Sequence, residues 1–175
     1  MEKRVKFIII GDKTVGKSCI INQFIEKQFI NEYIPTIGSD KKMNAMNMEE
    51  FNNGMFNIVF DKALLDSVLC GENALPLVEK MINEIHRVLV NGGYYIVVSN
   101  GNEDTRKHLF NPEMWEYKMI EIEKPSKVVV LDEKDPKNYH YIYILTKIAK
   151  EDDEKKDEEI KEDKKEDEKK NEKKK

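Results

Sequence analysis

Residues 4–18 read RVKFIIIGDKTVGKS. Residues 4–10 are rich in β-branched and apolar side chains, which predicts a buried strand that ends at Gly11. A helix is predicted over 17–27, because its apolar residues recur at helical spacing and form one stripe. The stripe consists of Ile20, Ile21, Phe24 and Ile25. A strand, a glycine-containing turn and a helix in this order indicate an α/β fold.

Strands and helices continue to alternate through most of the chain. Helices are predicted at 64–69 and 75–90. The remaining strands are predicted at 55–60, 94–99, 117–123 and 139–147. The last two alternate in polarity as antiparallel strands do, whereas the earlier ones read as buried parallel strands. The predicted fold class is therefore α/β, with a truncated, open Rossmann-like sheet that is mostly parallel and has late antiparallel strands.

Three shorter features are predicted within this pattern. Residues 43–48 are a candidate end of a short strand. The Asn-Gly-Gly sequence at 91–93 is a favourable stop for the helix predicted at 75–90. Cys19 and Cys70 lie in apolar surroundings, so both are expected to be buried thiols without disulfide or metal-ligand spacing.

The end of the chain has a different composition. Of the 175 residues, 37% are charged, compared with about a quarter in most globular domains. From Lys150 onward almost every residue is Lys, Glu or Asp. This segment has nothing to bury and is expected to be disordered. The predicted division is 1–41, 42–149 and a charged tail over 150–175.

Composition also restricts the classes of partner. The net charge of −4 favours neither nucleic acid nor an anionic membrane. No apolar run reaches the roughly 18 residues that a membrane span needs, and the first residues do not form a signal peptide. The final residues, NEKKK, form no lipidation signal. We therefore expect a cytoplasmic protein without a membrane anchor. The sequence does not indicate the oligomeric state.

The sequence GDKTVGKS at 11–18 has the G-x-x-x-x-G-K-[S/T] spacing, with a predicted strand before it and a predicted helix after it. Gly11 and Gly16 would let backbone N–H groups curl around phosphate oxygens. Lys17 would reach the outer phosphates, and the Ser18 hydroxyl would bind Mg²⁺. The alternative is a strand–helix turn that binds nothing.

Residues 4–38, which run from RVKFIIIG to YIPTIG, resemble the start of a Rab-type small GTPase. The resemblance implies GTP or GDP with Mg²⁺ as ligand, and it assigns Thr36 to the switch loop that senses the outer phosphate through Mg²⁺. The family's D-T-A-G-Q and N-K-x-D sequences do not follow. GTP hydrolysis is therefore not expected, and guanine selectivity has no visible basis.

Residues 43–148 resemble the back half of class I S-adenosylmethionine-dependent methyltransferases, of the protein-lysine type. The segments NIVFDKALLDS, HRVLVNGGYYIVVS and NYHYIYILTK carry this resemblance. It implies that Asn44 and Ala45 contact the adenine, that Asp61 and Lys62 lie beside the methionine end, and that a protein is the substrate. The family's glycine-rich loop and its ribose-binding acid are missing. Asn44 also stands where an aspartate is usual, so activity is expected to be weak or absent.

Several of these residues also have structural interpretations. Asp61 could cap the following helix, while Asp66 and Glu84 read as solvated helix charges. Aromatic side chains late in the chain read as packing residues, namely Trp115, Tyr141 and Tyr143. His108 and His140 have no partners at metal-ligand spacing.

The sequence favours a methyltransferase-like protein, and the alternatives are a nucleotide-phosphate-binding protein and a non-catalytic interaction module. One hypothesis joins the two resemblances. Residues 4–27 would occupy the sheet position vacated by the methyltransferase's first strand and helix, with the phosphate loop beside Asp61. The competing explanation is a rearranged or mispredicted gene product that joins two truncated coding regions.

Overall fold

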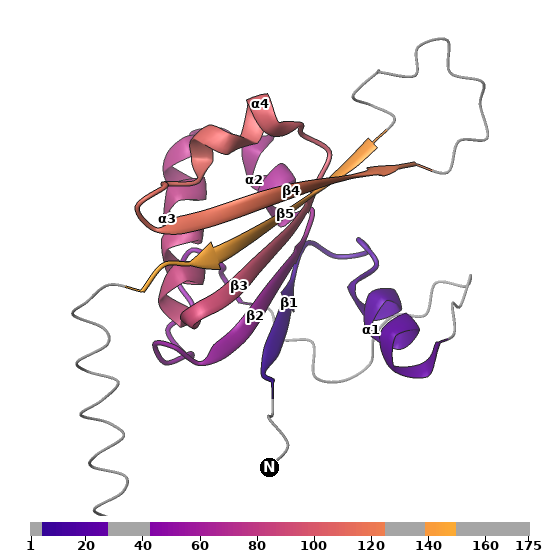
Figure 1. The fold of residues 1–175 in the computed structure, drawn as a ribbon, viewed down its shortest axis with the longest axis horizontal. Coiled ribbons are helices and arrows are strands. Elements are labelled where there is room, and N and C mark those ends of the chain that lie inside the picture. Colours follow the sequence, from indigo (N-terminus) through magenta and orange to yellow (C-terminus); the bar gives the residue numbers. More distant parts are fainter. Residues whose placement is uncertain (1–4, 28–42, 125–138, 150–175) are drawn as a thin grey trace, which may run out of the picture.

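The computed structural model describes residues 5–27, 43–124 and 139–149 (Figure 1). Thr36 and the charged tail lie outside the described residues. The elements are β1 (Phe7–Ile10), α1 (Lys17–Glu26), β2 (Phe56–Lys62), α2 (Leu64–Leu69), α3 (Ala74–Val88), β3 (Leu89–Ser99), α4 (Glu103–Arg106), a 3-10 turn (Lys107–Leu109), β4 (Trp115–Glu123) and β5 (Tyr139–Lys147).

These five strands form one sheet, in the order β1-β2-β3-β5-β4. The pairs β1–β2 and β2–β3 are parallel, whereas β3–β5 and β4–β5 are antiparallel. The structure therefore confirms the predicted fold class: an open α/β sheet with parallel early strands and antiparallel late ones. β1 is an edge strand, with β2 as its neighbour.

The pairing of β1 with β2 places both sequence resemblances in one sheet. The register runs from Phe7 opposite Ile58 to Ile10 opposite Asp61. Ile8 and Ile10 pack against the hydrophobic core. The strand within residues 4–27 thus lies where the hybrid hypothesis places it, beside the strand that contains Asp61.

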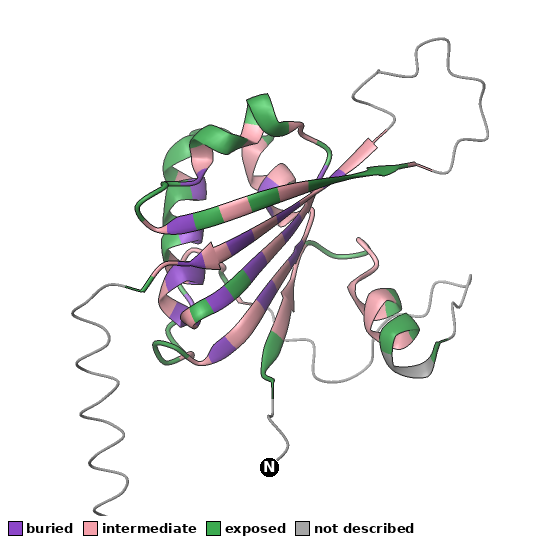
Figure 2. Cartoon of the chain, viewed as in Figure 1, coloured by how far each residue is buried: buried purple, intermediate pink, exposed green. Residues whose placement is uncertain are grey.

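One face of the sheet packs against α2 and α3 and forms the core (Figures 1 and 2). Side chains on successive strand residues point to opposite faces, and alternate residues of the central strands are fully buried. On this face they include Val59, Tyr95, Val97, Tyr143 and Leu145. The apolar stripe of α3 contributes Val78, Met81, Ile82 and Ile85, as its spacing predicts. Trp115, Tyr141 and Tyr143 are buried in the same core, which confirms their role as packing residues.

The alternate strand residues form a second face, here called the open face, whose side chains are half-buried or exposed. Their register follows from the pairing of the strands. Its apolar members include Phe7, Ile9, Ile58, Phe60, Tyr94, Ile96, Val98, Ile120, Ile122, Ile142 and Ile144. None of these side chains belongs to the core cluster of the described residues. Figure 2 shows the mixture of half-buried and exposed positions along the strands.

Two predicted boundaries are wrong. α3 ends at Val88, and β3 begins at once with Leu89. The Asn-Gly-Gly sequence at 91–93 lies inside β3, where the register shifts between the Phe56–Leu89 and Ile58–Tyr94 pairs. Gly92 adopts a positive φ of 70°, which glycine reaches without steric strain, so these residues form a bulge in the strand.

Residues 43–48 form a turn and not the end of a strand. The Asn47 amide donates to the Asn44 carbonyl at 3.0 Å, which closes the turn. The Asn44 side chain also accepts from the Met46 amide at 3.0 Å. Asparagine commonly bonds its own backbone in this way, and the bond competes with strand pairing.

The predicted burial of the two cysteines is also wrong, because Cys19 and Cys70 are both exposed. In the described part of α1, no residue belongs to the core cluster, and Phe24 keeps 70% of its surface exposed. Figure 1 shows α1 beyond the edge strand β1. An amphipathic pattern predicts that a helix can bury one face, but it does not specify the surface that receives that face.

Candidate functional site

The phosphate loop and the end of β2 lie side by side at the carboxyl edge of the parallel strands. Ile10 pairs with Asp61, so Gly11 follows next to Lys62. A Cβ atom added to Gly11 would lie 2.6 Å from the Lys62 carbonyl oxygen, a distance that real Cβ atoms do not show. The structure therefore brings Gly11 together with Asp61 and Lys62, although the two resemblances assign these residues to different ligands.

Three residues of the loop have positive φ values, a conformation that occurs in anion-binding turns. Positive φ values occur at Gly11 (154°), Thr14 (63°) and Gly16 (86°). Backbone that alternates between right- and left-handed conformations turns successive N–H groups toward one point and forms a concave anion site. Gly16 also caps α1, whose N-terminal end carries the positive pole of the helix dipole.

The Lys17 ammonium lies over this loop. It donates hydrogen bonds to the Gly11 carbonyl at 3.1 Å and to the Asp12 carbonyl at 2.8 Å. Ser18 is the next residue of α1 and is half-buried. The structure thus gathers Gly11, Gly16, Lys17 and Ser18, as the motif predicts. Thr36, the other predicted Mg²⁺ ligand, lies outside the described residues.

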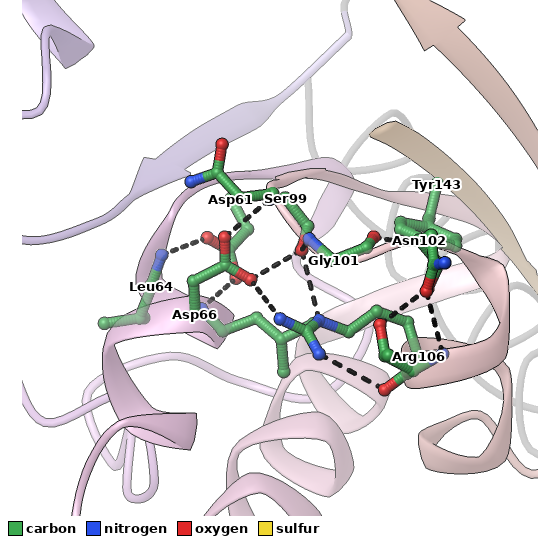
Figure 3. Close-up of polar contacts among 11 residues, drawn as sticks. Asp61, Leu64, Asp66, Ser99, Gly101, Asn102, Arg106 and Tyr143 are labelled. Carbon is green, nitrogen blue, oxygen red and sulfur yellow. Dashed lines mark hydrogen bonds and ion pairs between the residues drawn. The ribbon is translucent and has the colours of Figure 1, made fainter. Parts of the chain in front are cut away.

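Asp61 is fully buried and makes three hydrogen bonds (Figure 3). It accepts from the Leu64 amide at 2.6 Å, the Leu65 amide at 3.1 Å and the Tyr95 hydroxyl at 2.8 Å. Burial raises the pKa of Asp61 to about 6, although these three hydrogen bonds oppose the shift. Burial also raises the pKa of Tyr95, and the Asp61 carboxylate adds to that effect. The side chain therefore holds the start of α2, which confirms the structural interpretation of Asp61.

The bonds of Asp61 also bear on metal binding. P-loop NTPases hold Mg²⁺ with the loop Ser or Thr and an aspartate. Asp61 is the second-last residue of the strand beside the loop, but its carboxylate is directed at α2 and Tyr95. In the described part of the chain, no group of three or more His, Cys, Asp or Glu side chains could hold a metal ion.

Asp66 forms a polar network at the same edge of the sheet and is not a solvated helix charge. Its carboxylate accepts from the Ser99 hydroxyl at 2.5 Å and the Asn100 amide at 2.7 Å, and it pairs with Arg106 at 3.0 Å (Figure 3). The network attaches α4 to α2 and to the end of β3. The sequence pattern does not show it, because its members lie 33 to 40 residues apart from Asp66.

Glu84 also differs from its prediction, because it pairs with Arg87 at 2.9 Å. This hydrogen bond lowers the pKa of Glu84. Glu84 also accepts from the Met48 amide, and Arg87 donates to the carbonyls of Met48 and Phe51. The pair therefore holds the segment before β2 against the C-terminal end of α3.

Asn44 and Ala45 belong to the segment that this pair holds. Both hydrogen bonds of Asn44 stay within the 44–47 turn, and Ala45 packs against the core. The end of α3 leads directly into the start of β3, at the edge of the sheet opposite Asp61 and Lys62. Among the described residues, no hydrogen bond of Asn44 joins it to the carboxyl edge, and its predicted contact with adenine stays a prediction.

Comparison with known proteins identifies the first part of this site. Residues 6–63 match the model of the Ras family. The match covers the phosphate loop and extends past Gly38, where the predicted Rab-like segment ends, to the end of β2. It therefore includes Asp61 and Lys62, which border the loop in the structure.

Individual relatives agree over a short N-terminal stretch. The chain is 44% identical over 48 residues to the Ras-related protein Rab7A of Mesembryanthemum crystallinum, which covers 27% of this chain and 23% of the relative. It is 51% identical over 41 residues to the Ypt/Rab-type GTPase ypt71 of Schizosaccharomyces pombe, over 22% and 20% of the two chains. The chain thus spans about a fifth of the length of these relatives, and the predicted Rab-type resemblance is confirmed for that stretch.

Solved structures give a different likeness over most of the chain. A SAM-dependent methyltransferase from Methanosarcina mazei matches with a TM-score of 0.47 and 14% identity, over 82% of each chain. An arsenic (III) S-adenosylmethionine methyltransferase from Chlamydomonas reinhardtii matches with a TM-score of 0.26 and 11% identity, over 61% of this chain and 42% of that one. The fold class itself rests on the strand order described above. None of the described helices is long and apolar enough to cross a membrane.

Proposed function

We propose that the chain binds the phosphate groups of a nucleotide through residues 11–18 and does not hydrolyse them. One observation carries this proposal: the loop at the carboxyl edge has positive φ values at Gly11, Thr14 and Gly16, and the Lys17 ammonium donates hydrogen bonds to its carbonyls. Open α/β sheets bind ligands at this edge. Mg²⁺ would be held by Ser18 and, by the Rab-type resemblance, by Thr36.

The absence of hydrolysis follows from the groups that surround the loop. The water-orienting glutamine of the D-T-A-G-Q sequence is missing, and the Asp61 carboxylate is occupied by α2 and Tyr95. No N-K-x-D sequence is present to bind guanine. We therefore expect similar affinities for guanine and adenine nucleotides that carry the same number of phosphates.

Binding of S-adenosylmethionine, as in a protein-lysine methyltransferase of weak or lost activity, is the second candidate. The resemblance over 43–148 supports it, as does the carboxyl edge of the parallel strands, where open α/β sheets bind ligands. The hydrogen bonds made by the residues that are predicted to contact S-adenosylmethionine argue against this candidate. Asp61 is buried in hydrogen bonds, and the Asn44 side chain closes its own turn.

Thermal unfolding of the full chain with GDP and Mg²⁺, ATP and Mg²⁺, or S-adenosylmethionine separates these candidates. A ligand at about 100 times its Kd stabilises the folded state by about 2.7 kcal/mol. We expect stabilisation by both nucleotides, and its loss in Lys17→Ala. Stabilisation by S-adenosylmethionine alone would overturn the proposal in favour of the methyltransferase candidate. No shift with any of the three would favour a non-catalytic interaction module.

A further inference from the structure

A second lysine lies beside the phosphate loop. Gly11 follows Ile10, which pairs with Asp61, so Gly11 and Lys62 are neighbours across the strand pair, roughly 4.8 Å apart. The point where a Gly11 Cβ would lie is 2.6 Å from the Lys62 carbonyl oxygen and 3.5 Å from Lys17 Cδ. The Lys17 side chain on α1 and the backbone of Lys62 on β2 therefore both lie beside Gly11.

The side chain of Lys62 points to the open face of the sheet. Asp61 is buried on the helix-covered face, and successive strand residues alternate between faces. Across the sheet, Lys62 is level with Val98 and Ile142, which also belong to the open face. Lys62 is half-buried, and among the described residues its ammonium has no hydrogen bond or ion pair. All three of its donors are available to a ligand.

Lys62 and Lys124 both act electrostatically on one residue of the open face, His140. His140 lies on the open face, two residues before Ile142 on β5. Burial lowers the pKa of His140, and the charges of Lys124 and Lys62 lower it further. Asp66 opposes this effect, but its carboxylate is bound to Ser99, Asn100 and Arg106.

We propose that Lys62 is a second phosphate-binding residue, which makes the site select ligands that carry at least two linked phosphate groups. The inference rests on the proposed function, because the loop and Lys17 must first hold one phosphate. Lys17 and the loop amides would bind that phosphate, and Lys62 would bind the next one outward. A single phosphate satisfies the loop alone, whereas a diphosphate, triphosphate or inorganic pyrophosphate reaches both lysines.

Titration calorimetry of the full chain with inorganic phosphate and inorganic pyrophosphate tests the inference. A hydrogen bond to a charged group is worth enough to change affinity by about tenfold. We expect Lys62→Gln to weaken pyrophosphate binding by about tenfold and to leave phosphate binding unchanged. Lys62→Arg should restore most of the lost affinity, because it keeps the charge.

Lys118→Gln is the matched control, because Lys118 lies on the open face of β4 and its substitution removes the same charge far from the loop. It should change neither affinity. Equal effects of Lys62→Gln and Lys118→Gln would overturn the inference, since the effect would then reflect net charge. Equal weakening of phosphate and pyrophosphate by Lys62→Gln would also overturn it.

Lys17→Ala separates failure of this inference from failure of the proposed function. If Lys17→Ala abolishes pyrophosphate binding and Lys62→Gln leaves it unchanged, the phosphate loop functions and the role of Lys62 is wrong. If the unmodified chain binds neither anion, both proposals are wrong. As an independent readout, pyrophosphate should raise the pKa of His140, measured by NMR, in the unmodified chain and much less in Lys62→Gln.

Discussion

At the scale of single residues, Asp61 shows how a motif residue can have a structural role. A carboxylate after a buried strand in an α/β protein suggests a ligand contact, and the sequence allows that interpretation as well as a helix cap. The structure gives it two backbone amides and a tyrosine hydroxyl. Its complete burial raises its pKa to about 6, so its protonation is linked to folding.

The stability of the protein should therefore depend on the titration of Asp61. The folded state holds this proton up to about pH 6, compared with the ordinary value of 3.8, so the unfolding free energy falls as pH rises from about 4 to 6. The contribution of Asp61 to that fall is about 3 kcal/mol. Asp61→Asn removes it, because the amide does not titrate. Urea unfolding of both proteins at pH 4.5 and pH 7 measures the difference, and parallel pH profiles would contradict the burial of the charge.

A second prediction at this scale concerns Gly11, which combines a positive φ with close contact to Lys62. Gly11→Ala should destabilise the protein by about 1–3 kcal/mol and weaken phosphate binding. Gly16→Ala is the control. It also has a positive φ, but an added Cβ would meet nothing within 4 Å, so only the backbone strain of about 1 kcal/mol remains. Equal unfolding free energies for the two variants would mean that β1 does not pair closely with β2.

At the scale of elements, α3 and β5 could be predicted because their periodicity is long and regular. The α3–β3 boundary could not, because the glycines at 91–93 suit a helix end and a strand bulge equally well. The choice depends on the pairing of Phe56 with Leu89, which lie far apart in the sequence. The same limit applies to Arg87, whose contacts with Met48 and Phe51 have sequence separations of 39 and 36.

The prediction at this scale concerns Arg87, because this residue attaches the segment before β2 to α3. Arg87→Ala leaves two carbonyls and Glu84 without this donor, and should cost about 2–3 kcal/mol of unfolding free energy. Lys107→Ala is the contrasting variant. It breaks an ion pair of 3.5 Å whose side chains are 54% and 84% exposed, and such pairs contribute well under 1 kcal/mol. Similar losses in the two variants, measured by urea unfolding, would show that Arg87 is not a structural attachment.

At the scale of the whole molecule, the chain is one sheet assembled from two kinds of sequence. The matched strand–turn–helix order predicted the place of β1, and the pairing of Ile10 with Asp61 agrees with it. The position of α1 could not be predicted, because its stripe specifies an apolar face and no partner for that face. The open face of the sheet follows from the same cause: residues before 43 supply one strand to the sheet and cover neither face in the described structure.

The open face should limit solubility more than it contributes to stability. Ile120 and Ile122 keep 45% and 46% of their surfaces exposed, and exposed apolar patches promote association. Changing both residues to threonine should raise solubility and reduce binding of the dye ANS, with an unfolding free energy within about 0.5 kcal/mol of the original. Tyr141→Ala and Leu145→Ala, on the buried face of β5, should each cost several kcal/mol. A large loss of stability in the threonine variant would show that another part of the chain covers this face.

The edge position of β1 has a consequence for the time a ligand spends on the protein. Open α/β sheets hold nucleotides in a crevice between two strands whose connections run in opposite directions. In this chain β1, β2 and β3 follow one another in the same direction across the sheet. Among the described residues, the phosphate loop therefore has a neighbouring strand on one side and none on the other. Loss of contacts acts mainly on dissociation rates. A nucleotide held here would exchange quickly with nucleotide in solution, so the occupancy of the site would follow the nucleotide concentration. A nucleotide enclosed by strands on both sides would dissociate slowly, and the site would stay occupied after the concentration had fallen.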